Sequence, residues 1–404
     1  MILGPYRQIL NQPGVTALLV QSFLARIPIA AAPLLLTLHV VETMDRSYAQ
    51  SGLLAAVFAV GAAIGAPLLG RAIDRVGLRP VLVVTTAVDT GFWLAATHLS
   101  YPALLAGAFV GGLLAIPVFS VVRQSLAAIL PLHQRQGGLS LDSISVEMSF
   151  AVGPALGIVV LTQAGSTATL TLVGVLIALA GLSLFLLDPP MTSAAEHEAE
   201  PGPPVPARAW LRREAIALLL ITGAAAFTLA GTDTAIVAAL RSFDQTPFIG
   251  PVITVWCIAS MVGGFVYGAG RRVSPLLLLV LLAGLCIPVA LGGTWWLVAL
   301  LLVPTGAFCA PLVSATAQDL IEIAPARSRG QVTGLHVSAL TVGAAVGAPV
   351  VGVTVDTLDP RWGFVAIGGF GLVLAAAIGL AARLAPDRGT RQDDPTGVCL
   401  PASN

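Results

Sequence analysis

Ionisable side chains interrupt long apolar stretches of this sequence at four positions. They are Arg26, Arg123, Glu147 and Asp233. A charge at the centre of a bilayer costs at least ~2.5 kcal/mol, so such residues are normally kept for binding or ion transfer. A carboxylate in a medium of low dielectric constant tends to hold its proton, whereas a neighbouring arginine favours the ionised form. The four residues are therefore candidates for proton coupling or for contact with a charged ligand.

Arg123 and Glu147 lie at matching depths in neighbouring apolar segments. Arg123 is seven residues from the end of one segment and Glu147 nine residues into the next, which places both about 10–14 Å from the same side. The matching depth predicts an ion pair, either purely structural or one whose separation controls the protonation of Glu147. Asp233 is the competing candidate for the proton site, unless the adjacent Thr232 and Thr234 satisfy it locally.

Two further polar residues within apolar segments have simpler expected roles. Asp89 is expected to form a hydrogen bond with Thr85 or Thr86, which lie one turn before it. His336 is expected to be a packing residue rather than a proton relay. We therefore leave both out of the candidate site.

The composition requires a lipid environment. Apolar residues make up 56% of the 404 residues and charged residues only 10%, which is too apolar for one or two soluble cores. A membrane-spanning helix needs about 20 mainly apolar residues. The sequence therefore predicts an all-α polytopic membrane protein. Its twelve predicted transmembrane helices are residues 14–41, 51–70, 80–100, 103–130, 138–163, 167–187, 214–240, 247–270, 273–292, 294–324, 330–354 and 362–384.

The arginines set the orientation of the predicted helices. Fifteen of them fall on one side of the membrane, and only Arg46, Arg241 and Arg361 fall on the other. By the positive-inside rule the majority side is the cytoplasm, which then also holds both termini. All twenty basic residues are arginine, and this usage, with abundant alanine, glycine, proline and valine, is typical of a GC-rich bacterial genome. We therefore expect a multi-pass protein of the bacterial inner (plasma) membrane.

The composition and the motifs also argue against several classes of function. The net charge of zero gives no basis for a nucleic-acid partner. The four cysteines lack the spacing of a metal or redox site. No glycine-rich loop ends in the lysine and hydroxyl residue that bind nucleotide phosphates. We therefore expect no cofactor, no metal, no direct use of ATP and no enzymatic activity.

A polar interruption at residues 188–213 divides the chain into two halves. It carries an acidic run, a proline cluster and three arginines, a composition that predicts a cytoplasmic linker without a core of its own. The halves repeat at an offset of 195 residues, as in Pro80 with Pro275. The predicted domains are an N-terminal six-helix bundle (1–187), the linker (188–213), a C-terminal six-helix bundle (214–384) and a cytoplasmic tail (385–404).

A charged turn joins the second and third apolar segments. Gly70 is followed by Asp74 four residues on, Arg75 at five, Gly77 at seven and Arg79 at nine. The glycines allow a tight turn, and the charges can pair with each other or with a helix end. This spacing resembles the loop signature of the major facilitator superfamily of transporters, and the resemblance extends over essentially the whole chain.

The resemblance implies two six-helix bundles around a central cavity that opens alternately to the two sides of the membrane. In the family this loop packs against the start of the eleventh helix, which lies near Gly330 in this sequence. Free N–H groups and the helix dipole there would attract Asp74. The resemblance therefore implies that the motif is a gate, whereas the alternative is a solvated turn.

A glycine and proline motif marks the fifth predicted helix and is echoed in the eleventh. It consists of Gly153, Pro154 and Gly157, with Pro349 at the position 195 residues after Pro154. A proline inside a helix removes a hydrogen bond, and glycines permit close helix contact, so these helices can bend and approach their neighbours. The motif resembles that of the antiporter branch of the family, which implies export. A purely structural kink is the alternative.

The resemblance also assigns residues to the central cavity, because the family lines it with helices one, four, seven and ten. Arg26 then faces the cavity, where it could pair with Asp233 or bind an anionic substrate. Apolar walls with few charges suit a small amphipathic or hydrophobic molecule. The aromatic residues on these helices are Phe23, Phe119, Phe227 and Phe308.

We predict a secondary transporter that acts as a monomer in the lipid bilayer and exports a small amphipathic or hydrophobic molecule in exchange for protons. An importer or uniporter of a sugar-like or anionic metabolite is the alternative within the same fold. A non-transporting membrane sensor is the alternative from another class.

The orientation can be tested with reporters that are active on one side of the membrane. Fusions after Arg213 and Arg329 should report a cytoplasmic location, and fusions after Arg46 and Arg241 an external one, because basic loops resist translocation. Paired alkaline phosphatase and fluorescent-protein fusions measure this directly. A cytoplasmic signal at Arg46 together with an external signal at Arg213 would reverse the orientation.

Overall fold

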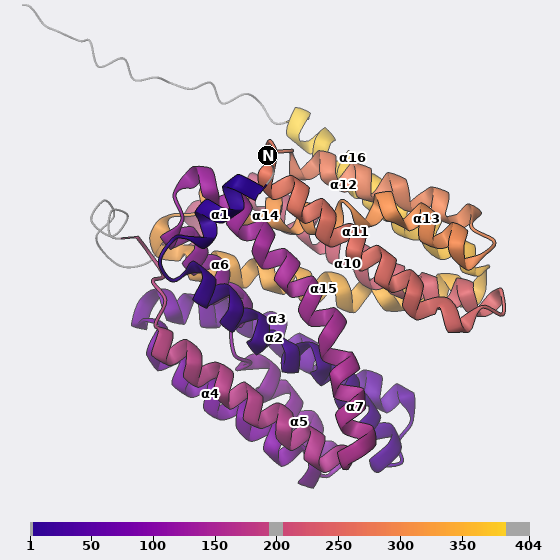
Figure 1. Cartoon of the computed structure of the whole chain (residues 1–404), viewed down its shortest axis with the longest axis horizontal. Helices are drawn as coiled ribbons and strands as arrows, with labels where there is room; N and C mark the ends of the chain where they lie inside the picture. Colours follow the sequence, from indigo (N-terminus) through magenta and orange to yellow (C-terminus); the bar gives the residue numbers. More distant parts are fainter. Residues whose placement is uncertain (1–2, 194–204, 385–404) are drawn as a thin grey trace, which may run out of the picture.

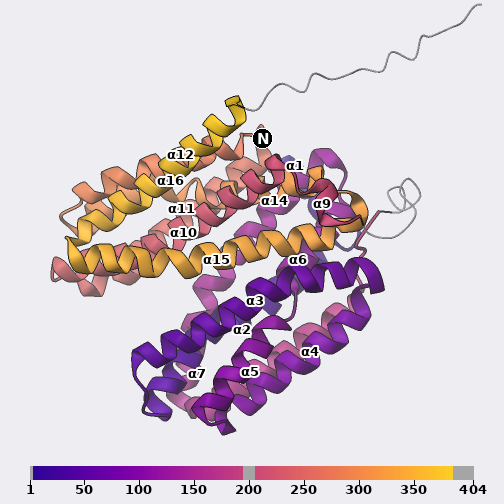
Figure 2. The same ribbon diagram turned by 180° about the vertical axis from the view of Figure 1, so that it is seen from behind.

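The fold consists of helices arranged in two bundles (Figures 1 and 2). The computed structural model describes residues 3–193 and 205–384, and these residues form no strand. In both views the two bundles lie at an angle to each other. They meet at the end that carries α1 (Leu3–Leu10) and the start of α15 (Arg329–Thr357), and they diverge toward the other end. We call the end where they meet the closed end.

Local sequence explains several helix boundaries in the first bundle. The Ser47 hydroxyl accepts a hydrogen bond from the N–H of Gln50, whose side chain accepts one from the N–H of Ser47, and this capping box starts α3. The same helix ends at Gly77, whose φ of 87° is strained for other residues. The helices of this bundle are α2 (Val15–Leu38) with its π-helical extension η1 (His39–Thr43), α3 (Tyr48–Val76), α4 (Leu78–Ala95), α5 (Tyr101–Leu113), α6 (Val118–Ile129) and α7 (Leu132–Leu187).

The second bundle repeats this order of helices. Trp295 begins the helix that follows a loop, and its N–H donates to the side-chain oxygen of Gln245 at 2.6 Å. The helices are α10 (Arg213–Ser242), α11 (Ile249–Ala269), α12 (Pro275–Cys286) with its extension η4 (Ile287–Leu291), α13 (Trp295–Gly306), α14 (Cys309–Ile323), α15 and α16 (Pro360–Leu384).

The lengths and compositions of the helices are compatible with the twelve predicted crossings. Within residues 3–193 and 205–384, ten helices are long and apolar enough to cross a membrane. One of them is α7, which is interrupted by Gly165 at φ 79° and ψ 171° and therefore supplies two crossings. A shorter apolar helix, Pro275–Leu291, supplies a further one. All twelve predicted segments thus fall on helices, and the predicted all-α fold is confirmed.

The fourth and tenth predicted segments are each broken near the middle. Residues 114–117 separate α5 from α6, and residues 307–308 separate α13 from α14. The breaks fall at nearly corresponding positions of the two halves. A break of this kind leaves backbone N–H groups without partners in their own helix, so other groups must satisfy them.

Glycines bring helices within each bundle into backbone contact. A methyl group on Gly112 of α5 would overlap the carbonyl oxygen of Phe58 in α3. One on Gly263 of α11 would overlap the carbonyl oxygen of Ala307. Because lipid provides no hydrophobic driving force between helices, such close packing holds membrane helices together.

The described part of the linker packs on the second bundle. Val205 and Ser328 exchange two hydrogen bonds of 3.0 Å between the Val205 backbone and the Ser328 hydroxyl. Trp210, at the end of α9 (Ala207–Trp210), is buried in a cluster with Leu218 and Leu320. This end of the linker is therefore held near the start of α15. The predicted acidic run and most of the proline cluster, and the predicted tail, lie outside the described residues.

Candidate functional site

Asp74 joins the two bundles at the closed end. Its Oδ1 accepts a hydrogen bond from the backbone N–H of Gly330, and its Oδ2 accepts one from Gln331, both at 2.8 Å. These N–H groups begin α15 and have no partner within the helix, and the positive end of the helix dipole favours a carboxylate there. The predicted contact between this aspartate and the start of the eleventh membrane helix is confirmed.

Small residues let α3 and α15 approach closely beside this contact. A methyl group on Gly70 would overlap the carbonyl oxygen of Gly330. Further along, one on Gly334 would overlap the carbonyl oxygen of Ala66, and the Ser338 hydroxyl donates to a carbonyl of α3 at 2.6 Å. The two bundles thus meet through backbone atoms along this part of α3.

The other residues of the motif shape the turn rather than the contact between bundles. Gly77 supplies the left-handed conformation that joins α3 to α4. Arg79 forms an ion pair with Asp188 at 3.1 Å, and its guanidinium lies 5.3 Å from the centre of the Phe185 ring. Both partners of this ion pair are largely exposed, so it contributes at most about 1 kcal/mol. Arg75 is exposed and forms no ion pair with any described residue.

The second bundle makes a different contact at the closed end. The side-chain amide of Gln136, near the start of α7, donates to the carbonyl of Tyr267 at 2.6 Å. Tyr6 of α1 stacks on Phe265 with ring centres 4.4 Å apart and donates to its carbonyl. Burial raises the pKa of Tyr6 to about 12, so its hydroxyl keeps the proton that it donates. Both contacts tie α11 to the first bundle.

A buried ion cluster occupies the core of the first bundle. Asp142 forms an ion pair with Arg26 at 2.7 Å and accepts a hydrogen bond from Arg123 at 3.1 Å, and all three side chains are almost fully buried. The predicted pair of Arg123 with Glu147 is therefore wrong. α7 begins at Leu132, six residues earlier than predicted, so Asp142 lies deep inside the helix rather than near a loop. Asp142 is not among the predicted site residues, because the predicted helix start at residue 138 placed it close to a loop.

The ion cluster reaches the second bundle through His336. The Arg123 guanidinium donates to Nδ1 of His336 at 2.8 Å, and Nε2 lies 3.1 Å from the hydroxyl of Thr316. Because an arginine can only donate, Nδ1 carries no proton and Nε2 is the protonated nitrogen. His336 on α15 and Thr316 on α14 both belong to the second bundle. His336 is buried with both ring nitrogens satisfied, as expected of a packing residue, and it also links the two bundles.

Arg26 does not face an open cavity. It is fully buried, and its guanidinium lies 4.8 Å from the centre of the Phe119 ring. The predicted pairing of Arg26 with Asp233 is wrong, because Arg26 forms its ion pair with Asp142 on α7.

The predicted aromatic residues of the cavity lie in different surroundings. Phe119 borders a cavity of the first bundle. Phe227 is buried against Phe370 of α16 with ring centres 4.2 Å apart. Phe308 packs against the core of the second bundle, and Phe23 is half-buried.

Glu147 forms a second link between the bundles. Its Oε1 accepts a hydrogen bond of 3.0 Å from the Ser260 hydroxyl on α11, and that hydroxyl accepts one of 3.2 Å from the N–H of Ala310. Asp233 on α10 is exposed and forms no hydrogen bond or ion pair with the described residues. Thr234 donates to a backbone carbonyl of its own helix instead. Glu147 therefore bridges the bundles, whereas Asp233 remains available to solvent or a ligand.

The glycines of the proline motif provide close packing. A methyl group on Gly153 of α7 would crowd the carbonyl oxygen of Ile27, and one on Gly157 would crowd Leu35. Both contacts are with α2. Pro154 and Pro349 lie inside α7 and α15. The packing role of the glycines is thus visible, and a bending role of the prolines stays a prediction.

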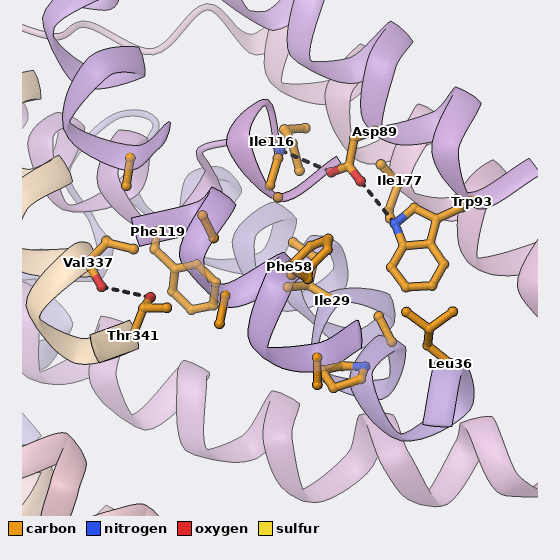
Figure 3. Close-up of a pocket in the computed structure, with 18 of the residues that line it drawn as sticks. Ile29, Leu36, Phe58, Asp89, Trp93, Ile116, Phe119, Ile177, Val337 and Thr341 are labelled. Atoms are coloured by element: carbon orange, nitrogen blue, oxygen red, sulfur yellow. Dashed lines mark hydrogen bonds between the residues drawn. The ribbon is translucent and has the colours of Figure 1, made fainter. Parts of the chain in front are cut away.

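An apolar cavity of about 370 Å³ lies in the first bundle, and α15 of the second bundle lines one side of it (Figure 3). Asp89 borders it and accepts from the Trp93 indole at 2.9 Å and from the N–H of Ile116 at 3.0 Å. The expected hydrogen bond of Asp89 with Thr85 or Thr86 is wrong. The break between α5 and α6 frees the N–H of Ile116, and Asp89 satisfies it. Within the described residues, no cluster of three or more histidine, cysteine, aspartate or glutamate side chains could hold a metal ion.

Comparisons with known proteins agree with this architecture. Residues 18–292 and 249–398 match the family Major Facilitator Superfamily. The human organic anion transporter MFSD10 (TETRAN) superposes with a TM-score of 0.73 at 17% identity, covering 91% of this chain and 99% of the other. The proton:xylose symporter XylE, bound to 6-bromo-6-deoxy-D-glucose, superposes with a TM-score of 0.68 at 12% identity, covering 92% and 96%. No curated protein matches the chain by sequence. The two structural likenesses concern the fold alone.

The ion cluster can be tested by removing its only acid. Asp142→Asn leaves the guanidinium groups of Arg26 and Arg123 buried without a counter-charge, and breaking a buried pair in this way costs about 3–5 kcal/mol. We expect a clearly lower midpoint of thermal unfolding in detergent. Asp188→Asn is the control, since it breaks only the exposed pair with Arg79. Equal midpoints for the two variants would contradict the pairing.

Proposed function

Because the chain belongs to the Major Facilitator Superfamily of secondary transporters, we propose that it exports a small amphipathic or hydrophobic molecule across the bacterial inner membrane in exchange for protons. The observation that carries this proposal is the contact of Asp74 with the start of α15, because it closes one end of the molecule through a breakable interaction. We place the closed end and both termini in the cytoplasm and propose that the chain works as a monomer.

Alternating access needs a contact that is stable in one state and reversible. A hydrogen bond to a charged group contributes about 1.5–3 kcal/mol, and Asp74 makes two with the first turn of α15. A few kilocalories are enough to populate one state strongly, and differential binding of a substrate or a proton is enough to reverse it. The Asp74 contact therefore has the strength that a gate requires.

Proton coupling needs an ionisable group whose surroundings change when the bundles separate. Glu147 meets this condition, because its hydrogen-bond partner Ser260 belongs to the other bundle. The surroundings of Arg123 would also change when the bundles separate, because its partner His336 belongs to the second bundle. A proton on Glu147 removes its charge and changes the strength of this link. We therefore favour Glu147 over Asp233, which contacts no described partner, as the coupling site.

The proposed direction and substrate depend on less specific features. The motif of Gly153, Pro154 and Gly157 with Pro349 resembles that of the antiporter branch, which favours export. The apolar cavity favours a molecule with a hydrophobic body. In the alternative, an importer or uniporter of a sugar-like or anionic metabolite, Arg26 would bind the substrate. Its full burial and its ion pair with Asp142 argue against that role.

Asp74→Asn should slow transport by roughly tenfold without loss of expression, because it weakens the charge-assisted hydrogen bonds that hold the closed end. The same change should expose a cysteine introduced at Val332, which is buried beside the contact, to a thiol reagent. Asp188→Asn, which removes an exposed carboxylate at the same end, is the control. A normal rate with unchanged labelling would mean that the motif is only a turn.

Glu147→Gln should abolish transport driven by a pH gradient in proteoliposomes while sparing exchange of substrate in the absence of a gradient. The amide keeps a hydrogen-bond acceptor for Ser260 but cannot take up or release a proton. Glu147→Asp, which retains the carboxylate, is the control, and a panel of candidate solutes supplies the substrate.

The same assay decides between the alternatives. Uncoupling by Asp233→Asn but not by Glu147→Gln would move the proton site to Asp233. If neither variant uncouples transport, proton antiport is replaced by the uniporter. If no solute moves at all, the sensor alternative gains support.

A further inference from the structure

The apolar cavity lies within the first bundle and is closed on one side by the second bundle (Figure 3). We propose that it binds a compact apolar molecule carrying a protonated amine, with Asp89 as the polar anchor. The role of this site in transport rests on the proposed function, but the binding itself does not.

The size and walls of the cavity suit a small molecule with one or two rings. Its volume of about 370 Å³ is at the lower end of the range of about 300–1,000 Å³ that is usual for small-molecule sites. Phe58, Trp93 and Phe119 contribute aromatic surface to its lining. Aromatic faces attract both apolar rings and cations.

Hydroxyl groups and the carboxylate of Asp89 supply the acceptors of this lining, and the hydroxyls of Thr37 and Ser51, which also line the cavity, can donate as well. The Ser120 hydroxyl donates to the carbonyl of Pro117, and the Thr341 hydroxyl donates to that of Val337. The Trp93 indole donates to Asp89. Among the described residues that line the cavity, none is an arginine, lysine or histidine. A ligand that brings its own donor and positive charge therefore complements this lining, whereas an anion does not.

Asp89 faces the cavity with its charge uncompensated by any cation. It is 3% exposed, and its two hydrogen-bond partners among the described residues, the Trp93 indole and the Ile116 N–H, are neutral donors. Each carboxylate oxygen can accept a further hydrogen bond. Arg26 does not supply the missing charge, because it lies against Phe119 and is paired with Asp142. An ammonium group in the cavity would supply it.

A ligand in this cavity would touch both bundles. Pro33 of α2 and Ala55 of α3 are exposed lining residues, which gives the cavity a mouth between these helices. Val337 and Thr341 of α15 line it from the second bundle. α15 also carries the N–H groups that Asp74 binds at the closed end. Occupancy of the cavity and closure of that end are therefore linked through one helix.

Binding can be measured by equilibrium dialysis of the full-length protein in lipid nanodiscs. The probes are radiolabelled 2-phenylethylamine, 2-phenylethanol and 3-phenylpropionate, which present a cation, a neutral group and an anion on similar frames. We expect the amine to bind at least about tenfold more tightly than the alcohol, as one charge-assisted hydrogen bond provides. The anion should bind more weakly than the alcohol. Asp89→Asn should lower the affinity for the amine to that for the alcohol.

Two further variants keep the test valid even if Asp89→Asn fails to fold. Ala59→Leu adds bulk to a residue that lines the cavity and should weaken binding of amine and alcohol alike. Ala56→Leu changes an exposed position of the same helix that does not line the cavity. It should change neither the affinity for the amine nor that for the alcohol.

The possible outcomes separate this proposal from the proposed function. Equal binding of amine and alcohol, or amine binding that Ala59→Leu leaves unchanged, would overturn the site. Binding as expected without flux in proteoliposomes would retain the site and reject transport of the amine. Flux of other solutes without amine binding would reject the site and retain the transporter.

Discussion

Charges and free N–H groups inside this protein must be satisfied by other parts of the chain, because lipid offers no hydrogen-bond partners. Carboxylates meet this demand at the critical points. Asp74 satisfies the N–H groups that begin α15, and Asp89 satisfies an N–H that the break between α5 and α6 sets free. Asp142 neutralises two buried arginines. A helix end and a helix break are thus tolerated here because a carboxylate lies beside each.

The same chemistry divides the molecule into two bodies that can separate. Within the first bundle, Asp142 makes two buried ion pairs, whose loss would be costly. Between the bundles, several of the links are single hydrogen bonds to ionisable groups, such as Glu147 with Ser260 and Arg123 with His336. Each of these contributes only a few kilocalories per mole. The bundles are therefore more strongly held together internally than to each other, which is the condition for rigid-body motion between them.

The sequence predicts the helices and the Asp74 contact well, because apolar length and motif spacing are local properties. It fails where partner choice depends on the direction in which a side chain points. Arg123 and Glu147 are at equal depths along their helices. Equal depth does not show whether the two side chains lie on helix faces that point toward each other. A helix start set six residues too late also hid Asp142. The partner of Asp89 could not be predicted, because the break that frees the N–H of Ile116 leaves no clear signal in an apolar segment.

The internal repeat shows how one charge makes the closed end asymmetric. Gln136 and Gln331 stand 195 residues apart, near the starts of the two helices that contact the opposite bundle. The backbone N–H of Gln331 binds the carboxylate of Asp74, whereas the position equivalent to that aspartate is Ala269. Gln136 therefore binds a neutral carbonyl through its side chain.

These two contacts differ in strength because only one of them is charge-assisted. A neutral hydrogen bond contributes about 0.5–1.5 kcal/mol and one to a charged group about 1.5–3 kcal/mol. Near α7, Tyr6 compensates in part for the weaker neutral hydrogen bond, because it stacks on α11 and donates a hydrogen bond to the backbone of α11. That compensation is apolar and neutral, so it does not respond to charge. Of the two contacts, the one between α3 and α15 alone can be weakened by neutralising a single residue, so the proposed gate would depend on the electrostatics of this helix end.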